Sequence, residues 1–291
     1  MISTPPTDLI KNVPRPLARI LLVSFLWMLI SAAAPAAPKS VLWDRWTAHN
    51  PTSTAEIDHS AWTQVLKSSL QASPDGVNRL PYARMEKTHG RILDDYVAVL
   101  TATAISKHNR DQQRAYWINL YNAVTVQLVL DHYPVNSILD IDISPGFFTF
   151  GPWDKKLIDV EGESLSLNDI EHRILRPIWK DPRIHYAVNC ASIGCPNLMP
   201  TAFTADNAEV LLDEGAVAYV NHPRGVEIID GKPVTSSIYY WFKEDFGASD
   251  SGVLDHLRRY AAPRIRGRLA SFTRLNGHSY DWRLNDTEKR E

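Results

Sequence analysis

The sequence has few cysteines and no excess of charge of either sign. Only two cysteines occur in 291 residues, so the chain cannot build a disulfide framework or a four-cysteine zinc site. The 31 Lys and Arg residues nearly balance the 33 Asp and Glu residues, giving a net charge of −2. A nucleic-acid-binding domain usually carries a basic excess, so this balance argues against nucleic acid as a partner.

The common short motifs of cofactor and zinc chemistry are also missing. The sequence contains no phosphate-binding GxxxxGK[ST] segment, no GxGxxG, no HExxH and no GxSxG. We therefore expect no cofactor and no metal ion. What remains is a composition typical of a globular protein, with 44% hydrophobic and 22% charged residues. A chain of this length can bury one large core or two small ones.

No apolar run reaches the ~20 residues that a membrane-spanning helix needs. The longest run, residues 20–34, follows three basic residues and ends at an A-x-A pattern, Ala34-Pro35-Ala36. This order is typical of a secretory signal peptide. The sequence predicts a signal peptide over residues 1–36 and a periplasmic or secreted protein. The alternative is an uncleaved N-terminal segment, which would then be the only membrane contact that we expect.

The rest of the chain predicts one domain behind a short linker. We expect a linker over residues 37–55, with Trp43 and Trp46 docking onto the body, and a single domain over residues 56–291. Helical periodicity and turn signals predict elements at residues 58–66, 85–105, 110–132, 157–166 (hairpin), 168–176, 184–189 (strand), 206–220 and 226–235 (hairpin). Helices mixed with short hairpins, without regular βαβ alternation, predict a helix-rich α+β fold with a small antiparallel sheet.

The segment 110–132 is the most apolar of the predicted helices. Its apolar residues cover most of the circumference, which is typical of a central buried helix. Asn119 and Asn122 lie three residues apart and therefore share a face. Buried amides must find hydrogen-bond partners. Either these two side chains tie down a neighbouring loop, or they line a binding site.

A candidate nucleophile follows the predicted strand at residues 184–189. Cys190 comes directly after it, and the small residues Ala191, Ser192 and Gly194 leave room for a substrate carbonyl and for N–H groups that bind an oxyanion. A thiol needs a nearby base, usually a histidine, to become the reactive thiolate at neutral pH.

Two histidines are candidates for that base. On a regular strand, His185 and Cys190 lie an odd number of residues apart and face opposite sides, which argues against His185. His172, on the preceding helix, is the preferred base. Glu171 is expected to assist it as an acid or an orienting group, although adjacent helical residues point roughly 100° apart.

The two cysteines also allow other interpretations. A Cys190–Cys195 disulfide would suit an exported protein and would disable the nucleophile. A redox function is less favoured because the spacing is not C-x-x-C. A metal site made from the two cysteines and a histidine lacks the paired spacings that identify zinc sites.

Three segments carry a resemblance to a known family. AYWINLYNAV (residues 115–124), LNDIEHRILRP (167–177) and DPRIHYAVNCASIGCPNL (181–198) resemble the family called domain of unknown function 547, or DUF547. The resemblance extends over roughly residues 58–260 and includes SSIYYWFKEDFG (236–247). It implies an exported protein similar to cysteine peptidases of the papain and transglutaminase type. The order of His before Cys is reversed from papain, so a papain-like fold would be permuted.

The leading hypothesis is an exported cysteine hydrolase acting on peptide or protein substrates. Its catalytic residues would be Cys190 as nucleophile, His172 as proton shuttle and Glu171 as helper, and its binding residues would be Asn119, Asn122, Ser192 and Arg176. An acyltransferase with the same nucleophile is a further option. The alternative is a non-catalytic binding or scaffold module of the cell envelope. In it Asn119, Asn122, Glu171 and Arg176 would form a buried polar network, and Cys190 and Cys195 would form a disulfide.

Overall fold

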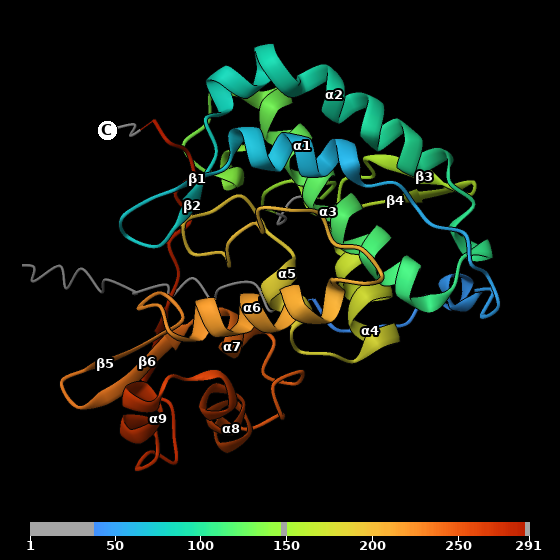
Figure 1. Cartoon of the computed structure of the whole chain (residues 1–291). Coiled ribbons are helices and arrows are strands. Elements are labelled where there is room, and N and C mark those ends of the chain that lie inside the picture. Colours follow the sequence, from blue (N-terminus) through green and yellow to red (C-terminus); the bar gives the residue numbers. More distant parts are fainter. Residues whose placement is uncertain (1–37, 147–149, 289–291) are drawn as a thin grey trace, which may run out of the picture. The chain divides into compact units, whose positions relative to one another are not determined.

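The computed structural model describes residues 38–146 and 150–288 (Figure 1). The predicted signal peptide, residues 1–36, lies outside this part of the chain. Within the described residues, no helix is long and apolar enough to span a bilayer.

The helices confirm the helix-rich prediction, and several match it closely. The helix expected over residues 110–132 is α3 (Arg110–His132), and it is buried around most of its circumference. The remaining longer helices are α1 (Ser60–Ser69), α2 (Tyr82–Ala102), α6 (Ala208–Val220), α8 (Asp250–Tyr260) and α9 (Pro263–Leu269). Short helices are η1 (Asp44–Thr47), η2 (Ile105–Lys107), η3 (Ile138–Asp140), η4 (Asp169–Leu175), α4 (Arg176–Trp179), α5 (Ile184–Ala187) and α7 (Ile238–Trp241).

The strands form three small separate sheets, which confirms the α+β class. The strands are β1 (Gln71–Ala72), β2 (Asn78–Arg79), β3 (Ile158–Val160), β4 (Glu163–Leu165), β5 (Val226–Ile229), β6 (Lys232–Ser236) and β7 (Gly277–Ser279). Three antiparallel pairs, β1–β2, β3–β4 and β5–β6, include both predicted hairpins. The third sheet also holds β7 parallel to β6, so it is mixed and not purely antiparallel.

The side chains of these helices and strands form two hydrophobic cores. The larger one surrounds α3 and includes residues of α1 and α2; α2 packs against α3, and α1 packs against α2 (Figure 1). The smaller one gathers buried aromatic and aliphatic residues of α6, α7 and α8, among them Tyr219 and Tyr239. The Cys190 loop starts from α5, and Tyr186 of that helix belongs to the smaller core.

The prediction of a strand at residues 184–189 is wrong. Residues 184–187 form α5, and Val188, which follows it, is extended. The Asp-Pro-Arg sequence before it starts the helix: the Asp181 carboxylate accepts the backbone N–H of Arg183 at 2.9 Å, and Pro182 needs no acceptor for an N–H there. The strand-based reason for setting His185 aside therefore does not hold.

The helix predicted to end at Pro177 continues through it. The π-helix η4 passes directly into α4, with Pro177 in the first turn of α4. Since proline has no N–H to return to the preceding turn, backbone carbonyls are left available there. The carbonyls of His172 and Arg173 accept the backbone N–H groups of Val41 and Trp43, each at 3.0 Å.

The segment expected as a linker lies against these helices. Trp46 is buried with its ring 5.0 Å from that of Trp117 in α3, and Trp43 packs on the same core. The expected docking of the two tryptophans is confirmed.

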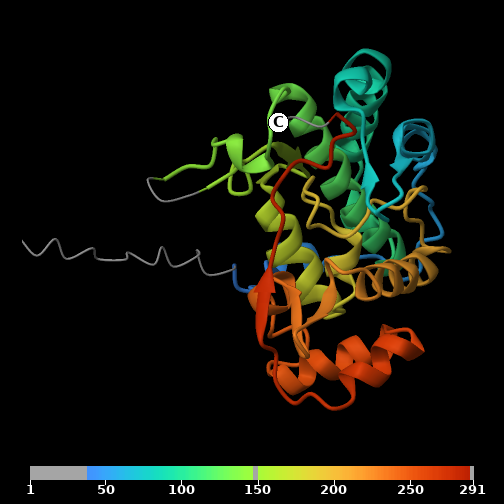
Figure 2. The same cartoon turned by 90° about the vertical axis from the view of Figure 1, so that its left-hand side faces the viewer.

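The C-terminal segment connects the third sheet to the α1–α3 side of the molecule (Figure 2). After β7 it runs beside the cysteine loop: Ile193 and Gly194 donate to the carbonyls of Arg283 and Asp281, and Asn285 donates to that of Ala191. Gly194 is needed here because a Cβ atom would lie 2.9 Å from the backbone nitrogen of Asp281. This close pairing places Tyr280 beside the cysteine loop.

Candidate functional site

Two buried amides shape the loop that carries the cysteines. Asn122 of α3 donates to the carbonyl of Ala187 and accepts the N–H of Asn189, both at 2.8 Å. Asn189 in turn accepts the N–H of Ala191 at 2.8 Å and donates to the carbonyl of Pro196. Ala191 has φ of 59°, in the left-handed region that non-glycine residues rarely adopt. These contacts fold the loop back on itself.

The fold-back brings Cys190 and Cys195 together as free thiols. The backbone N–H of Cys190 donates to the sulfur of Cys195 at 2.9 Å. The hydroxyl of Tyr280 lies 3.1 Å from the sulfur of Cys190 and donates to that of Cys195 at 3.2 Å. Since a tyrosine hydroxyl has one proton to donate, the Cys190 thiol is the donor in its own contact with Tyr280. A hydrogen-bonded path thus runs from Cys190 through Tyr280 to Cys195.

The two thiols have different pKa values because their environments differ. Burial acts to raise the pKa of Cys195, but hydrogen bonds from Cys190, Tyr280 and Ser192 outweigh it and lower the pKa to about 7. Burial and the neighbouring Cys195 raise the pKa of Cys190 well above its usual value. The thiolate of the pair is therefore centred on Cys195, which is buried, while Cys190 is only half-buried.

Most backbone N–H groups of the loop already have acceptors. The N–H of Cys190 binds the Cys195 sulfur, that of Ala191 binds Asn189, and those of residues 193–195 bind backbone carbonyls. Within the described residues, the N–H of Ser192 has no hydrogen-bond acceptor. Of the N–H groups expected to form an oxyanion site, only that of Ser192 is therefore available without rearrangement.

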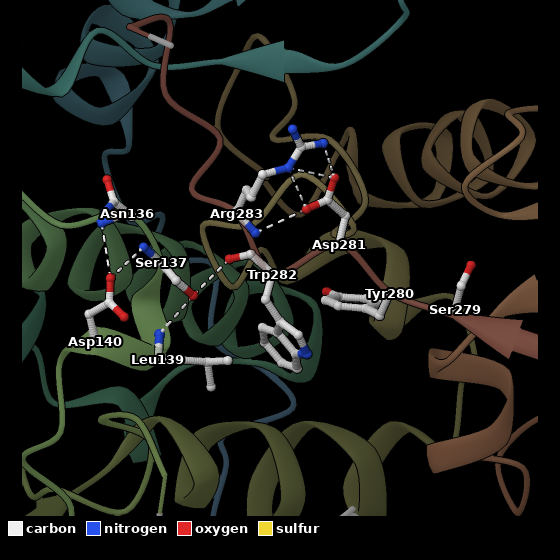
Figure 3. Close-up of a pocket in the computed structure, with 9 residues that line it drawn as sticks. All are labelled: Asn136, Ser137, Leu139, Asp140, Ser279, Tyr280, Asp281, Trp282 and Arg283. Atoms are coloured by element: carbon white, nitrogen blue, oxygen red, sulfur yellow. Dashed lines mark hydrogen bonds and ion pairs between the residues drawn. The ribbon is translucent and has the colours of Figure 1, made fainter. Parts of the chain in front are cut away.

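An open pocket of about 600 Å³ has Tyr280 among its lining residues, whereas neither cysteine lines it. Figure 3 shows the residues that line it, from the segments 136–140 and 279–283. The rings of Tyr280 and Trp282 are 4.6 Å apart, and Trp241 and Trp153 continue this aromatic group. Tyr280 thus lines the pocket and also contacts both sulfurs.

A second polar cluster holds the predicted Glu171 and His172. His185 lies between two carboxylates, with Nε2 2.7 Å from Asp245 and Nδ1 3.4 Å from Glu171. Arg176 donates from Nε to Asp245 at 2.6 Å and from Nη1 to Nδ1 of His172 at 3.0 Å. These side chains are buried, apart from the partly exposed Asp245, and the ring of Phe242 stacks on that of His185 at 4.3 Å.

The charges of this cluster balance one another. Burial acts to raise the pKa values of Glu171 and Asp245, but the cationic neighbours lower each of them to about 2. Burial acts to lower the pKa of His185, but its contacts with Asp245 and Glu171 raise it. Two anions therefore face the cations Arg176 and His185.

His172 is held neutral in a defined tautomer. Burial lowers its pKa to about 4, although Glu171 acts in the opposite direction. Because Arg176 can only donate, Nδ1 of His172 accepts and its proton lies on Nε2. In this arrangement Nε2 is a hydrogen-bond donor and not the base that we expected from the sequence.

The histidine cluster and the thiol pair are neighbours without direct contact. Among the described residues, no hydrogen bond or ion pair joins a histidine to either sulfur. Burial raises the pKa of Tyr121, and the charges of Glu171 and both cysteines raise it further, so its hydroxyl lies within electrostatic range of both groups. At the end of α7, Trp241 contacts Tyr280, while Phe242 contacts the histidines.

The structure gives the predicted binding residues specific roles. Both side-chain atoms of Asn119 bind the backbone of Phe203, and those of Asn122 bind the cysteine loop, so these amides tie down loops and do not line the pocket. This confirms the first of the two interpretations given for them. Arg176 belongs to the buried ionic cluster. Ser192 lies in the site, with its hydroxyl 3.3 Å from the Cys190 sulfur.

Three residues of the site have no local signal in the sequence. Tyr280 lies 90 residues from Cys190 along the chain, and Trp282 reaches the pocket on the same segment. Asp245 lies 60 residues from His185. Only the SSIYYWFKEDFG segment, which carries Asp245, was singled out by resemblance. No group of three or more metal-binding side chains lies together among residues 38–146 and 150–288.

The fold and the site define a helix-rich α+β protein with one half-buried and one buried thiol, both in contact with Tyr280, which also lines a pocket. Residues 105–220 match the model of the family described as "Protein of unknown function, DUF547". This range contains the three quoted motifs and both cysteines, and SSIYYWFKEDFG lies outside it. The resemblance is thus confirmed for residues 105–220. No curated protein and no solved structure matches the chain.

Proposed function

We propose that the protein is an exported cysteine hydrolase that cleaves amide bonds in peptide or protein substrates, with Cys190 as its nucleophile. One observation carries the proposal: Tyr280, which contacts the Cys190 sulfur at 3.1 Å, is also a wall of the pocket of about 600 Å³. A half-buried cysteine in contact with a residue that lines a pocket is placed to reach a carbonyl group bound near Tyr280.

The neighbouring thiol supplies the base in this proposal. The Cys190 proton passes to Cys195, directly or through Tyr280, and the Cys190 thiolate adds to the substrate carbonyl. The N–H of Ser192 donates to the oxyanion that forms. The C–N bond then breaks, Cys195 returns the proton to the leaving amine, and water hydrolyses the remaining thioester.

Glu171 and His172 act as positioning residues in this proposal. They do not contact the sulfurs, and Arg176 holds His172 with its proton on Nε2. Their cluster fixes α5, from which the cysteine loop starts, and Phe242, whose neighbour Trp241 packs on Tyr280.

The test uses a generic activated ester and a peptide library with the reduced protein. We expect an acyl group to appear on Cys190 by mass spectrometry and then to be released. The Cys190→Ala variant should lose both acylation and turnover. The matched control is Asn197→Ala, whose amide supports the same loop region but touches neither sulfur. Acylation of other residues at equal rates, or none at Cys190 in folded protein, would refute the proposal.

A further inference from the structure

The two thiols differ in their accessibility to solvent, as do the two cysteines of a dithiol that exchanges with other disulfides. Cys190 is half-buried, whereas Cys195 is only 4% exposed. Both sulfurs lie within 3.2 Å of one tyrosine oxygen, and the loop is turned so that the N–H of Cys190 points at the sulfur of Cys195. Both sulfurs thus lie close to one tyrosine oxygen, and closeness of the two side chains is one of the conditions for a disulfide.

We propose that Cys190 and Cys195 form a reversible redox pair that exchanges with external disulfides, in addition to any hydrolytic role of Cys190. Cys190 is the entry thiol and Cys195 the resolving thiol. The substrate class is a low-molecular-weight or protein disulfide, R–S–S–R. The inference does not depend on the proposed hydrolysis, because it requires neither the pocket nor an oxyanion site.

The exchange with the external disulfide takes place in two steps, in which atoms and electrons balance. The Cys190 thiolate attacks one sulfur of R–S–S–R, forming a Cys190–S–S–R mixed disulfide and releasing RS⁻. The Cys195 thiolate then attacks the Cys190 sulfur, forming the intramolecular disulfide and releasing the second RS⁻. Two protons pass from the protein dithiol to the two released thiolates, the protein is oxidised by two electrons, and the external disulfide is reduced to two thiols.

Three contacts favour this assignment of roles. The N–H of Cys190 and the hydroxyl of Tyr280 both donate to Cys195, which stabilises a thiolate at the resolving position. The contact between Cys190 and Tyr280 gives the entry thiol a route by which to lose its proton. The C-x₄-C spacing does not by itself indicate that the two cysteines are neighbours. They come together because Ala191 has a left-handed backbone conformation and because the N–H of Cys195 donates to the carbonyl of Ser192 in a turn.

The test is a redox titration of the purified full chain in defined mixtures of reduced and oxidised glutathione. Samples are quenched by alkylation and read by intact-mass and peptide mass spectrometry. We expect the unmodified sequence to form the intramolecular disulfide and to return to the dithiol as reduced glutathione increases. This first measurement needs no variant and so does not depend on whether a variant folds.

Single-cysteine variants then assign the roles. Cys195→Ser should accumulate a glutathione adduct on Cys190, because the resolving thiol is absent. Cys190→Ser should react at least roughly tenfold more slowly, since the remaining thiol is buried. The inference is overturned if both variants react equally fast, if the parent protein accumulates the adduct, or if the disulfide fails to form or to be reduced. Failure of ester and peptide cleavage alone would refute only the hydrolase.

Discussion

Removing the hydroxyl of Tyr280 should raise the pKa of Cys195. In the structure this hydroxyl donates to the Cys195 sulfur at 3.2 Å and also contacts Cys190. The Tyr280→Phe variant keeps the aromatic ring that packs on Trp241 and Trp282. Its expected effect is therefore on the proton affinity of the thiol pair and not on packing.

The size of the shift follows from the charge of the acceptor. A hydrogen bond to a charged group contributes about 1.5–3 kcal/mol. Since one pKa unit corresponds to about 1.4 kcal/mol, losing this bond should raise the pKa of Cys195 by about one to two units. The starting value is about 7, so the thiolate population at neutral pH should fall steeply in Tyr280→Phe.

The assay is the ultraviolet absorbance of thiolate as a function of pH. The chain has only two cysteines, so the signal below the tyrosine titration reports on this pair alone. We expect one thiolate to form near neutral pH in the parent protein. The control is Tyr116→Phe, since that buried hydroxyl donates to the carbonyl of Leu100. An unchanged midpoint in folded Tyr280→Phe, or an equal shift in the control, would show that this hydrogen bond does not set the pKa.

Three further predictions concern the histidine cluster. Asp245→Asn should destabilise the fold by roughly 3–5 kcal/mol in urea denaturation, because the buried cations Arg176 and His185 would lose a counter-charge. A loss below about 1 kcal/mol would contradict this reasoning. The lowered pKa of Asp245 means that its stabilisation is complete above about pH 4 and is lost as the pH falls towards 2, so acid unfolding of Asp245→Asn should lack this component. His172→Ala should leave the pH midpoint of the Cys195 thiolate unchanged, and a shift of a unit or more would make His172 part of the thiol chemistry.

Much of the fold was predictable because local chemistry decides it. Residues 110–132 are apolar around the helix, and Asn109 caps them by accepting the N–H of Gln112, so α3 begins and ends as the sequence predicts. The Asp230-Gly231 pair supplies the two positive φ angles that the tight hairpin turn of β5 and β6 requires. Each of these signals lies within a few residues of the element that it determines.

The errors arose where a local signal competed with another or was outweighed by tertiary contacts. Residues 184–189 are rich in strand-forming types, yet the Asp181-Pro182 start and the buried packing of Tyr186 favour a helix. Pro177 usually closes a helix, but here the Val41–Trp43 segment takes up carbonyls of the turn that precedes it. No periodicity could reveal this contact, since it joins segments about 130 residues apart.

The candidate site shows the same contrast between local sequence signals and tertiary contacts. Cys190 and the Glu171–His172 pair can be recognised in the sequence. Their hydrogen-bond partners cannot, because Arg176 sets the tautomer of His172 and Tyr280 of the C-terminal segment contacts Cys190. A hydrogen-bond partner 90 residues away cannot be inferred from spacing. The sequence therefore singled out the Cys190 thiol as a candidate, but the structure places Cys195 and Tyr280 beside it and not a histidine.

One backbone group connects the two proposed reactions of the thiol pair. The N–H of Cys190 donates to Cys195 and so helps to keep the thiolate there, which suits exchange with a disulfide. In hydrolysis, an oxyanion on a carbonyl attached to Cys190 would compete for that same N–H. If the N–H turned to the oxyanion, Cys195 would lose a hydrogen bond and its pKa would rise towards that of Cys190. Cys195 would then accept the Cys190 proton more readily at the moment of attack. A substrate analogue that forms a stable tetrahedral adduct on Cys190 should therefore raise the pKa of Cys195 further than a mixed disulfide on Cys190 does, because both adducts remove the Cys190 thiol proton but only the first carries an oxyanion. Thiolate absorbance would separate the two cases, and equal behaviour of both adducts would rule out this coupling.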